Sequence, residues 1–292
     1  MNQQTNAIPP VICLKHLLSM WDDEAAVLHD AYASGQQRGP ITGFTTLDAE
    51  ISGAFTPGVH VIHGVPGSGK TALALQIAST CGCPALLTTC EMSPLELLRR
   101  ITARCTKTYL GRLKTGELTP EQSRRLVEQS ITQTPNLVLQ DATQTIATLE
   151  SIRSAAIATR RLTPELPHLL LVVDSLHSWA DRVASDMTEY DRLNVSIEAL
   201  RKLGQELGCP ILCIAERNRA SMASGGLSAG AGTRKIEYAA ETVIDLDVDS
   251  DRKADAYGNS EVTLTLAKNR HGTPGKRIKM AFHGATQTFT EA

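Results

Sequence analysis

The residues that could carry chemistry begin with a glycine-rich run, Gly64-Val65-Pro66-Gly67-Ser68-Gly69-Lys70-Thr71. Glycines at this spacing let backbone N–H groups curl around phosphates, and the positive end of a following helix adds to the attraction. Lys70 is expected to reach the β- and γ-phosphates, and the Thr71 hydroxyl to hold Mg²⁺. The run therefore predicts a site for ATP and Mg²⁺ made by Gly64, Pro66, Gly67, Ser68, Gly69, Lys70, Thr71 and Ala72.

Two carboxylates stand where such a site needs them. Asp174 directly follows the apolar run 169–173, the position of a second Mg²⁺ ligand at the end of a buried strand. Glu91 lies just past the strand-like segment 85–89, where an acid could orient and activate the water that attacks the γ-phosphate. The plainer alternatives are that Asp174 caps the following turn and that Glu91 benefits from the dipole of the next helix.

Charged residues also follow two later strand-like segments. Glu216 comes after the apolar run 211–215 and could sense the γ-phosphate, although a solvated strand end would look the same. Lys268 and Arg270 stand two residues apart at the predicted tip of a hairpin, so their side chains point the same way and could face one phosphate. A solvated basic turn is the alternative for this pair.

The elements that must position these residues alternate between strands and helices from residue 41 onward. Short, continuously apolar strands are predicted at 59–63, 85–89, 137–140, 169–173, 211–215 and 243–248, and a hairpin at 262–267 and 277–282. Helices are predicted at 70–80 and 188–207, and capping boxes at Ser93–Glu96 and Thr119–Gln122. This pattern predicts an α/β fold with a mostly parallel sheet flanked by helices and ending in an antiparallel hairpin.

Two parts of the chain stand apart from this pattern. Residues 1–40 are predicted to be an N-terminal arm whose segment 12–32 forms an amphipathic helix, and residues 41–292 to be the catalytic domain. The helix could pack on its own domain or on a neighbouring subunit. The segment 220–232, rich in glycine, alanine and serine, is predicted to be a mobile loop.

Composition limits the partners. The 292 residues carry 29 Lys and Arg against 31 Asp and Glu, so any contact with nucleic acid must be local rather than spread over a basic surface. No apolar run is long enough to span a membrane and no signal peptide is evident, which predicts a cytoplasmic protein. The seven cysteines lack zinc-site spacing and are expected to be reduced core thiols.

Taken in order, these motifs resemble the C-terminal motor domain of DnaB-type replicative DNA helicases, within the RecA-like ring helicases of superfamily four. The resemblance rests on Thr42–Asp48, Cys90–Ser93, Asp174, Ile236-Glu237 and, above all, Ala267–Gly275. It implies a RecA-like core in which Glu91 is catalytic. It further implies that Lys268 and Arg270 reach the γ-phosphate of the adjacent subunit in a ring. The ring is expected to be a hexamer that moves 5′ to 3′ on single-stranded DNA.

The sequence departs from the family pattern at three places. Glu216 stands for a sensor glutamine, His177 stands for a glutamine after the metal-binding aspartate, and the DNA loop offers Arg217, Arg219, Arg234 and Lys235 instead of the usual arginine pattern. We expect no counterpart of the family's primase-contacting domain in this sequence. We expect partners among replication or mobile-element proteins, and the departures favour nucleotide hydrolysis over processive unwinding of duplex DNA.

Three functions remain open at this level. The leading one is an ATP-hydrolysing, ring-forming helicase or translocase on single-stranded DNA. The second is a RecA-like or clock-type ATPase that switches its assembly state without unwinding. The third is a nucleotide-binding adaptor with weak hydrolysis.

Overall fold

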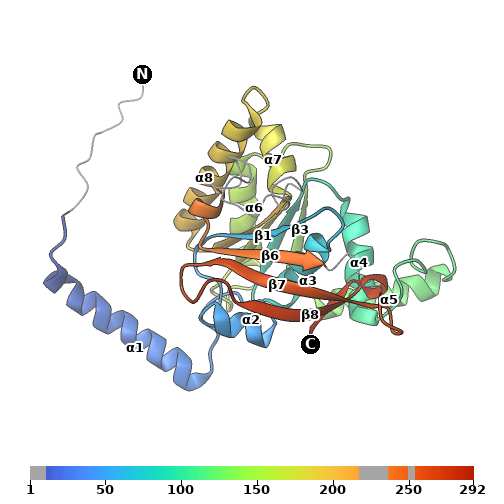
Figure 1. Cartoon of the computed structure of the whole chain (residues 1–292), viewed down its shortest axis with the longest axis horizontal. Coiled ribbons are helices and arrows are strands. Elements are labelled where there is room, and N and C mark those ends of the chain that lie inside the picture. The colour runs from blue at the N-terminus through green and yellow to red at the C-terminus, as the bar shows by residue number, and fades with distance from the viewer. Residues whose placement is uncertain (1–10, 217–235, 249–253) are drawn as a thin grey trace. The chain divides into compact units, whose positions relative to one another are not determined.

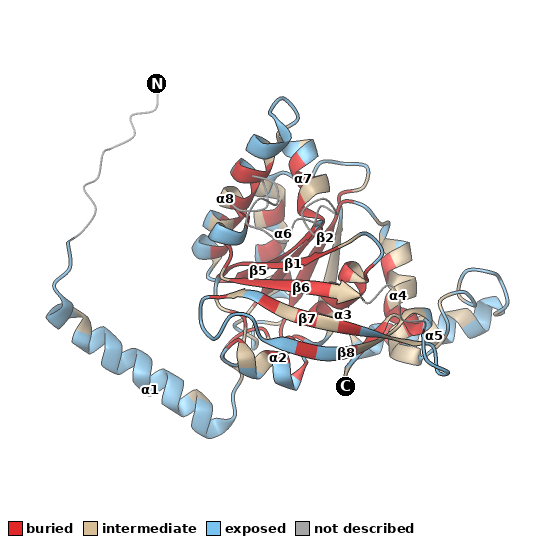
Figure 2. Ribbon diagram, viewed as in Figure 1, coloured by how far each residue is buried: buried red, intermediate tan, exposed pale blue. Residues whose placement is uncertain are grey.

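The computed structural model describes residues 11–216, 236–248 and 254–292. They form two compact units that divide between Arg38 and Gly39. The first contains the 3-10 turn η1 (Leu14–Leu17) and the helix α1 (Leu18–Ser34), which ends at Gly35 in the left-handed conformation. Neither element buries a side chain, and Trp21 is 68% exposed (Figure 2).

The second unit is built on one nine-stranded sheet in the order β3-β2-β4-β5-β1-β6-β7-β8-β9. The first six strands in this order are parallel, and β7 to β9 join them in antiparallel pairs (Figure 1). The strands are β1 (Gly58–Gly64), β2 (Ala85–Thr89), β3 (Leu137–Asp141), β4 (Leu170–Asp174), β5 (Pro210–Glu216), β6 (Thr242–Val248), β7 (Asn259–Asn269), β8 (Arg277–His283) and β9 (Thr288–Glu291).

Helices cover both faces of this sheet because its parallel strands are apolar on both sides. Successive side chains of a strand point to opposite faces. In β4, Leu170 and Val172 therefore enter one core with helices α3 and α4, whereas Leu171 and Val173 enter a second core with α6, α7 and α8. The helices are α2 (Thr45–Glu50), α3 (Lys70–Thr80), α4 (Pro94–Thr106), α5 (Pro120–Gln133), α6 (Leu149–Arg161), α7 (Leu176–Val183), α8 (Glu189–Leu207) and the 3-10 turn η2 (Gly284–Thr286).

This architecture confirms the predicted fold class and extends it. The predicted C-terminal hairpin is β7 and β8, and a further strand, β9, pairs with β8. The capping box predicted at Thr119 is complete. The one predicted at Ser93 is only half formed, because the Ser93 hydroxyl accepts from the Glu96 amide while the Glu96 carboxylate pairs with Lys114 and nearby arginines.

Within the described parts of the chain, no helix has both the length and the apolar composition that a bilayer crossing requires. Five of the seven cysteines are buried, and the Cys81 and Cys83 sulfurs lie 3.6 Å apart.

Candidate nucleotide-binding site

The glycine-rich loop connects the buried strand β1 to helix α3. Gly67 and Gly69 have φ angles of 81° and 96°, which side chains rarely adopt, and Gly69 is the residue before the first turn of α3. A Cβ atom on Gly64 would lie 2.7 Å from the Ser68 hydroxyl. The loop therefore needs glycine at these positions to turn its backbone amides inward at the N-terminus of a helix, which is the arrangement that binds phosphate.

An aromatic pair supports the loop from the C-terminal strands. The rings of Phe282 and Phe289 stack with centroids 4.3 Å apart, and a Cβ atom on Gly69 would lie 3.1 Å from the Phe289 ring. The Gln76 side-chain amide also exchanges two hydrogen bonds with the backbone of Phe289. Helix α3 and strand β9 are thus fixed together directly behind the phosphate-binding loop.

Lys70 is held inside the loop that it serves. Its Nζ atom donates to the carbonyl oxygens of Gly64 and Val65, each at 2.9 Å. Burial lowers the pKa of the Lys70 ammonium, and the carboxylates of Glu216, Glu91 and Asp174 oppose that shift. An ammonium held by backbone carbonyls inside a glycine-rich loop has the position and charge to bind a polyphosphate.

Thr71 and Asp174 fit the requirements of a magnesium site. Asp174 ends β4 and is 1% exposed, and the Thr71 hydroxyl is near enough to its carboxylate to favour the charged form. Burial raises the pKa of Asp174 to about 6, Glu91 adds to the shift, and the Thr71 hydroxyl and Lys70 reduce it. The Asp174 Oδ2 atom is buried and has no hydrogen-bond partner among the described residues. A hard cation that prefers oxygen ligands would satisfy this atom.

Glu91 follows β2 and is oriented by two serines, one directly after β4 and one in the first turn of α7. Its Oε1 atom accepts hydrogen bonds from the hydroxyls of Ser175 and Ser178, the latter at 2.7 Å. The amide of Cys90 also donates to the Asp174 carbonyl, which ties the ends of β2 and β4 together. Sequence reasoning missed both serines, although their position directly after the predicted metal-binding aspartate was a usable signal.

Glu216 and His177 are neighbours, so two of the three departures from the family pattern occur together. The Glu216 amide donates to His177 Nδ1 at 3.4 Å, and Glu216 lies opposite Gly64 in the pairing of β5 with β1. Burial lowers the pKa of His177, and the Glu216 carboxylate opposes this effect. The strand-end position predicted for a γ-phosphate sensor is therefore occupied by an acid beside a largely neutral imidazole.

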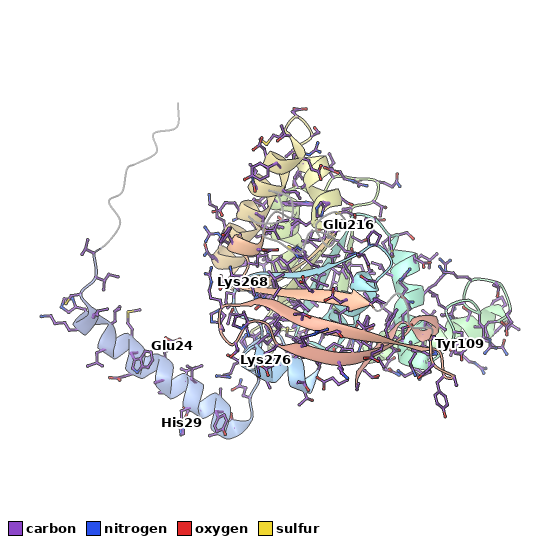
Figure 3. The ribbon with its side chains drawn as sticks, viewed as in Figure 1. Glu24, His29, Tyr109, Glu216, Lys268 and Lys276 are labelled. Carbon is purple, nitrogen blue, oxygen red and sulfur yellow. The ribbon has the colours of Figure 1, made fainter. Side chains whose placement is uncertain are left out.

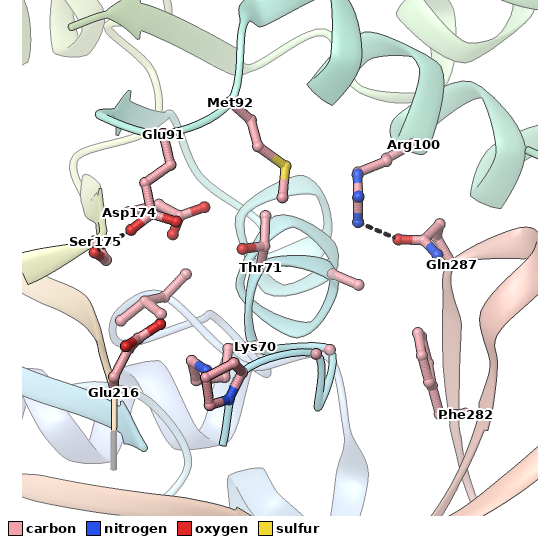
Figure 4. A pocket seen from close by; sticks show the side chains of 15 residues that line it. Lys70, Thr71, Glu91, Met92, Arg100, Asp174, Ser175, Glu216, Phe282 and Gln287 are labelled. Carbon is pink, nitrogen blue, oxygen red and sulfur yellow. Dashed lines mark hydrogen bonds between the residues drawn. The ribbon is translucent and has the colours of Figure 1, made fainter. Parts of the chain in front are cut away.

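One cavity of about 370 Å³ lies among these elements (Figure 4). Of the predicted residues, its lining includes Pro66, Gly67, Gly69, Lys70, Thr71, Ala72, Glu91, Asp174 and Glu216. Gly64 and Ser68 are buried within the loop. The carboxylates gather on one side of Thr71 in Figure 4, which places negative charge where a bound metal ion and an attacking water would be needed.

The other side of the cavity holds residues that sequence reasoning missed. Arg100, from α4, donates to the side-chain oxygen of Gln287 at 2.6 Å, and Phe282 lies beside them (Figure 4). Gln287 has a φ angle of 54°, an uncommon conformation for a residue other than glycine. Nothing in the spacing of Arg100 and Gln287 marks them as neighbours, because they are 187 positions apart.

Lys268 and Arg270 lie away from this cavity. Strand β7 runs antiparallel to β6, so its last residues meet the beginning of β6, where Thr242 pairs with both His60 and Asn269. The cavity forms at the opposite end of β1, and the seven residues of β1 span roughly 20 Å. Figure 3 labels Lys268 and Glu216, which lie toward these two ends of the strands.

The four predicted DNA contacts, Arg217, Arg219, Arg234 and Lys235, lie outside the described residues, as does the predicted loop 220–232.

Known proteins resemble this chain over nearly its whole length. A family model for the DnaB-like helicase C terminal domain matches residues 39–291. The replicative DNA helicase DnaB of Geobacillus stearothermophilus is 26% identical over 281 residues, which cover 92% of this chain and 60% of that protein. The replicative DNA helicase DnaB of Leifsonia xyli is 27% identical over 280 residues, which cover 89% of this chain and 57% of that protein. The chain thus spans about three-fifths of the length of these curated relatives.

Solved structures share the fold. The ATPase domain of G40P superimposes with a TM-score of 0.77 at 19% identity, covering 93% of this chain and 98% of that domain. A DnaB-like replicative helicase, solved to describe its interactions with primase, gives a TM-score of 0.74. The RadB recombinase and a KaiC-like protein of Pyrococcus horikoshii give 0.56 and 0.57. The fold is RecA-like, and by the match over residues 39–291 the chain belongs to the DnaB-like helicase C-terminal domain family.

Proposed function

We propose that this protein is an ATP-hydrolysing motor that assembles into a ring, hexameric by family resemblance, and acts on single-stranded DNA as a helicase or translocase. The observation that carries the proposal is the division of charges over the sheet. The acids and Lys70 line the cavity at one end, whereas the basic pair Lys268 and Arg270 is at the other. A subunit built this way has half of an active site at each end.

In the proposed reaction, ATP lies in the cavity with its phosphates on the amides of the loop and the ammonium of Lys70. Thr71 and Asp174 would hold Mg²⁺, which neutralises charge on the phosphates when bound. Glu91, held by Ser175 and Ser178, orients a water molecule and accepts its proton as it attacks the γ-phosphate. Glu216 stands at the adjacent strand end, where the presence or loss of the γ-phosphate would change its surroundings.

The neighbouring subunit completes this chemistry in the proposal. Lys268 and Arg270 of one subunit reach the γ-phosphate bound by the next and stabilise the charge that develops in the transition state. Groups of this kind are worth about 10³- to 10⁵-fold in rate. An isolated subunit is therefore expected to bind nucleotide and turn it over very slowly.

The test is ATP turnover with and without single-stranded DNA, combined with a mass measurement with and without nucleotide. The proposal predicts nucleotide-supported rings and a rate that rises when DNA is added. Rings whose turnover does not respond to DNA would contradict the proposed motor function. A monomer with full turnover would contradict the proposed sharing of an active site between subunits.

An assembly switch of the recombinase or clock type is the second candidate. It is supported by the fold shared with the RadB recombinase and the KaiC-like protein. It predicts nucleotide-dependent assembly without displacement of a DNA strand. A strand-displacement assay on a forked duplex separates the two candidates, because only the motor releases a labelled strand.

A further inference from the structure

Glu241 joins the strand of the phosphate-binding loop to the basic end of β7. Its amide donates to the carbonyl of Val59, in β1, at 2.7 Å. Its own carbonyl accepts from the amide of Arg270 at 2.9 Å. The backbone of Glu241 therefore sets the distance between the first residues of β1 and Arg270.

The side chain of Glu241 makes a second connection to the same region. Its Oε1 atom accepts from Arg270 Nη1 at 3.1 Å, and its Oε2 atom lies 3.3 Å from His271 Nε2. The Glu241 side chain is 14% exposed, whereas that of Arg270 is 53% exposed. The acid is thus fixed inside the protein, and the arginine that it holds extends outward.

A glycine in β1 makes room for this arrangement. Gly58 has a φ angle of 135°, and a Cβ atom there would lie 2.8 Å from Glu241 Cγ. Any larger residue at this position would push the Glu241 side chain away from Arg270. The local backbone is therefore shaped around the acid.

Lys268 is held from the same segment by uncharged groups. Its Nζ atom donates to the carbonyl oxygens of Glu237 at 2.8 Å and of Tyr238 at 2.9 Å, in the helical turn at residues 236–239. Lysine often binds the last carbonyls of a helix in this way. Both members of the basic pair are thus held by the segment that enters β6, Arg270 through a carboxylate and Lys268 through backbone carbonyls.

We propose that Glu241 is a positioning residue, which holds Arg270 in the direction needed to reach the phosphate bound by the neighbouring subunit. The inference rests on the proposed function. A guanidinium has five N–H donors, and among the described residues its side chain donates one bond, to Glu241, which leaves donors for a phosphate. Holding a long side chain in advance removes conformational freedom that would otherwise oppose the contact.

The first experiment measures ATP turnover of the full chain with Glu241→Ala, Glu241→Asp and Glu241→Gln. We expect Glu241→Ala to lower kcat about 10- to 100-fold, as misplacement of a reacting group does, with KM for ATP nearly unchanged. Glu241→Asp keeps the carboxylate and should recover part of the loss. Glu128→Ala, which removes the exposed acid paired with Arg124, is the matched control and should leave turnover unchanged.

Mixed rings then identify the active site on which Glu241 acts. Adding Lys70→Ala subunits to Glu241→Ala subunits should restore turnover, because the first supply an intact basic pair and the second an intact loop. Adding Arg270→Ala subunits should not restore it, because neither chain supplies a positioned arginine. If Glu241 acted only on its own nucleotide site, these two results would be reversed, and the inference would be overturned.

Two further outcomes are informative. Mixed Lys70→Ala and Arg270→Ala rings that stay inactive would contradict the shared active site itself, and the role of Glu241 would fall with it. A rate increase in Glu241→Ala would show that the acid restrains Arg270, which also overturns the inference. If Glu241→Ala does not fold, Glu241→Gln, which has nearly the same shape, takes its place in every mixture.

Discussion

Charged side chains are arranged differently at the two ends of the strands in the central sheet. At the carboxyl ends of β1, β2, β4 and β5, the acids and Lys70 crowd into one cavity, and Asp174 Oδ2 is buried without a partner among the described residues. At the other end, Lys268 and Arg270 are paired within the chain and partly exposed. In our proposal the first end receives phosphate and metal, and the second extends toward the neighbouring subunit.

This difference explains how a chain with a formal charge of −2 could handle two polyanions. The 29 Lys and Arg are balanced by 31 Asp and Glu, so we expect each subunit to offer few contacts to DNA. In the proposed ring, the basic end of one subunit meets the acidic cavity of the next. The following predictions test that contrast, beginning with the largest effect.

Replacing the exposed arginine tests the remote end. Arg270→Ala should reduce DNA-stimulated turnover by about 10³-fold or more, because a charge-stabilising group is lost from the transition state. Nucleotide affinity should change little, since Arg270 does not line the cavity. Turnover and binding of a fluorescent ATP analogue check this, with Arg124→Ala as the surface control. A loss of less than tenfold would mean that the two ends do not share a reaction.

Removing the charge of Glu91 tests the cavity end. Glu91→Gln should lower kcat by about 10²- to 10⁴-fold, the usual contribution of a general base. The amide keeps the shape of the side chain and still accepts the serine hydrogen bonds, so ATP binding should persist. Steady-state kinetics measure the effect, and Glu117→Gln, at an exposed ion pair with Arg112, serves as the control. Wild-type turnover in Glu91→Gln would assign the base elsewhere.

The buried ring of His60, near the basic end of the strands, should make stability depend on pH. Burial lowers its pKa to about 4, so the folded protein keeps the ring neutral while the unfolded chain, with a pKa near 6.5, binds a proton. Stability should therefore fall as pH drops from about 6.5 to 4, by up to about 3 kcal/mol for this one group. Urea unfolding at several pH values should show that the free energy of unfolding of His60→Phe falls less steeply below pH 6.5 than that of the wild type. An unchanged slope would contradict this role of His60.

Asp174 should behave in the opposite way. Its pKa of about 6 exceeds the ordinary value of 3.8, so the folded protein binds the proton more tightly and loses stability as pH rises from about 4 to 6. At pH 7 the free energy of unfolding of Asp174→Asn should therefore exceed that of the wild type by up to about 3 kcal/mol, measured by urea unfolding. The variant should nevertheless lack turnover. The gain should vanish below pH 4. If Asp174→Asn is less stable than the wild type at pH 7, burial does not penalise the charged form of this carboxylate in the folded protein.

Much of the fold followed from local pattern. The strands at 59–63, 85–89 and 211–215 were predicted because parallel strands covered on both faces must be continuously apolar. Helix α3 begins at Lys70 as predicted, since its first turn is fixed by the phosphate-loop motif. The half-formed cap at Ser93 shows the limit of such reasoning: Glu96 could bond either its own helix start or a distant cation, and Lys114 decided the outcome.

The sequence alone determined which chemical groups were present and which strand each would follow, because the loop motif and the apolar runs are local features. It placed Asp174 and Glu91 at strand ends and Lys70 at the start of a helix, but it could not bring Arg100 to Gln287, or Ser175 to Glu91. Only the tertiary structure decided that Lys268 and Arg270 lie at the opposite end of the strands from the cavity and that Glu241 holds Arg270. The reason is physical: strand order and direction depend on contacts between distant segments, which no local spacing records.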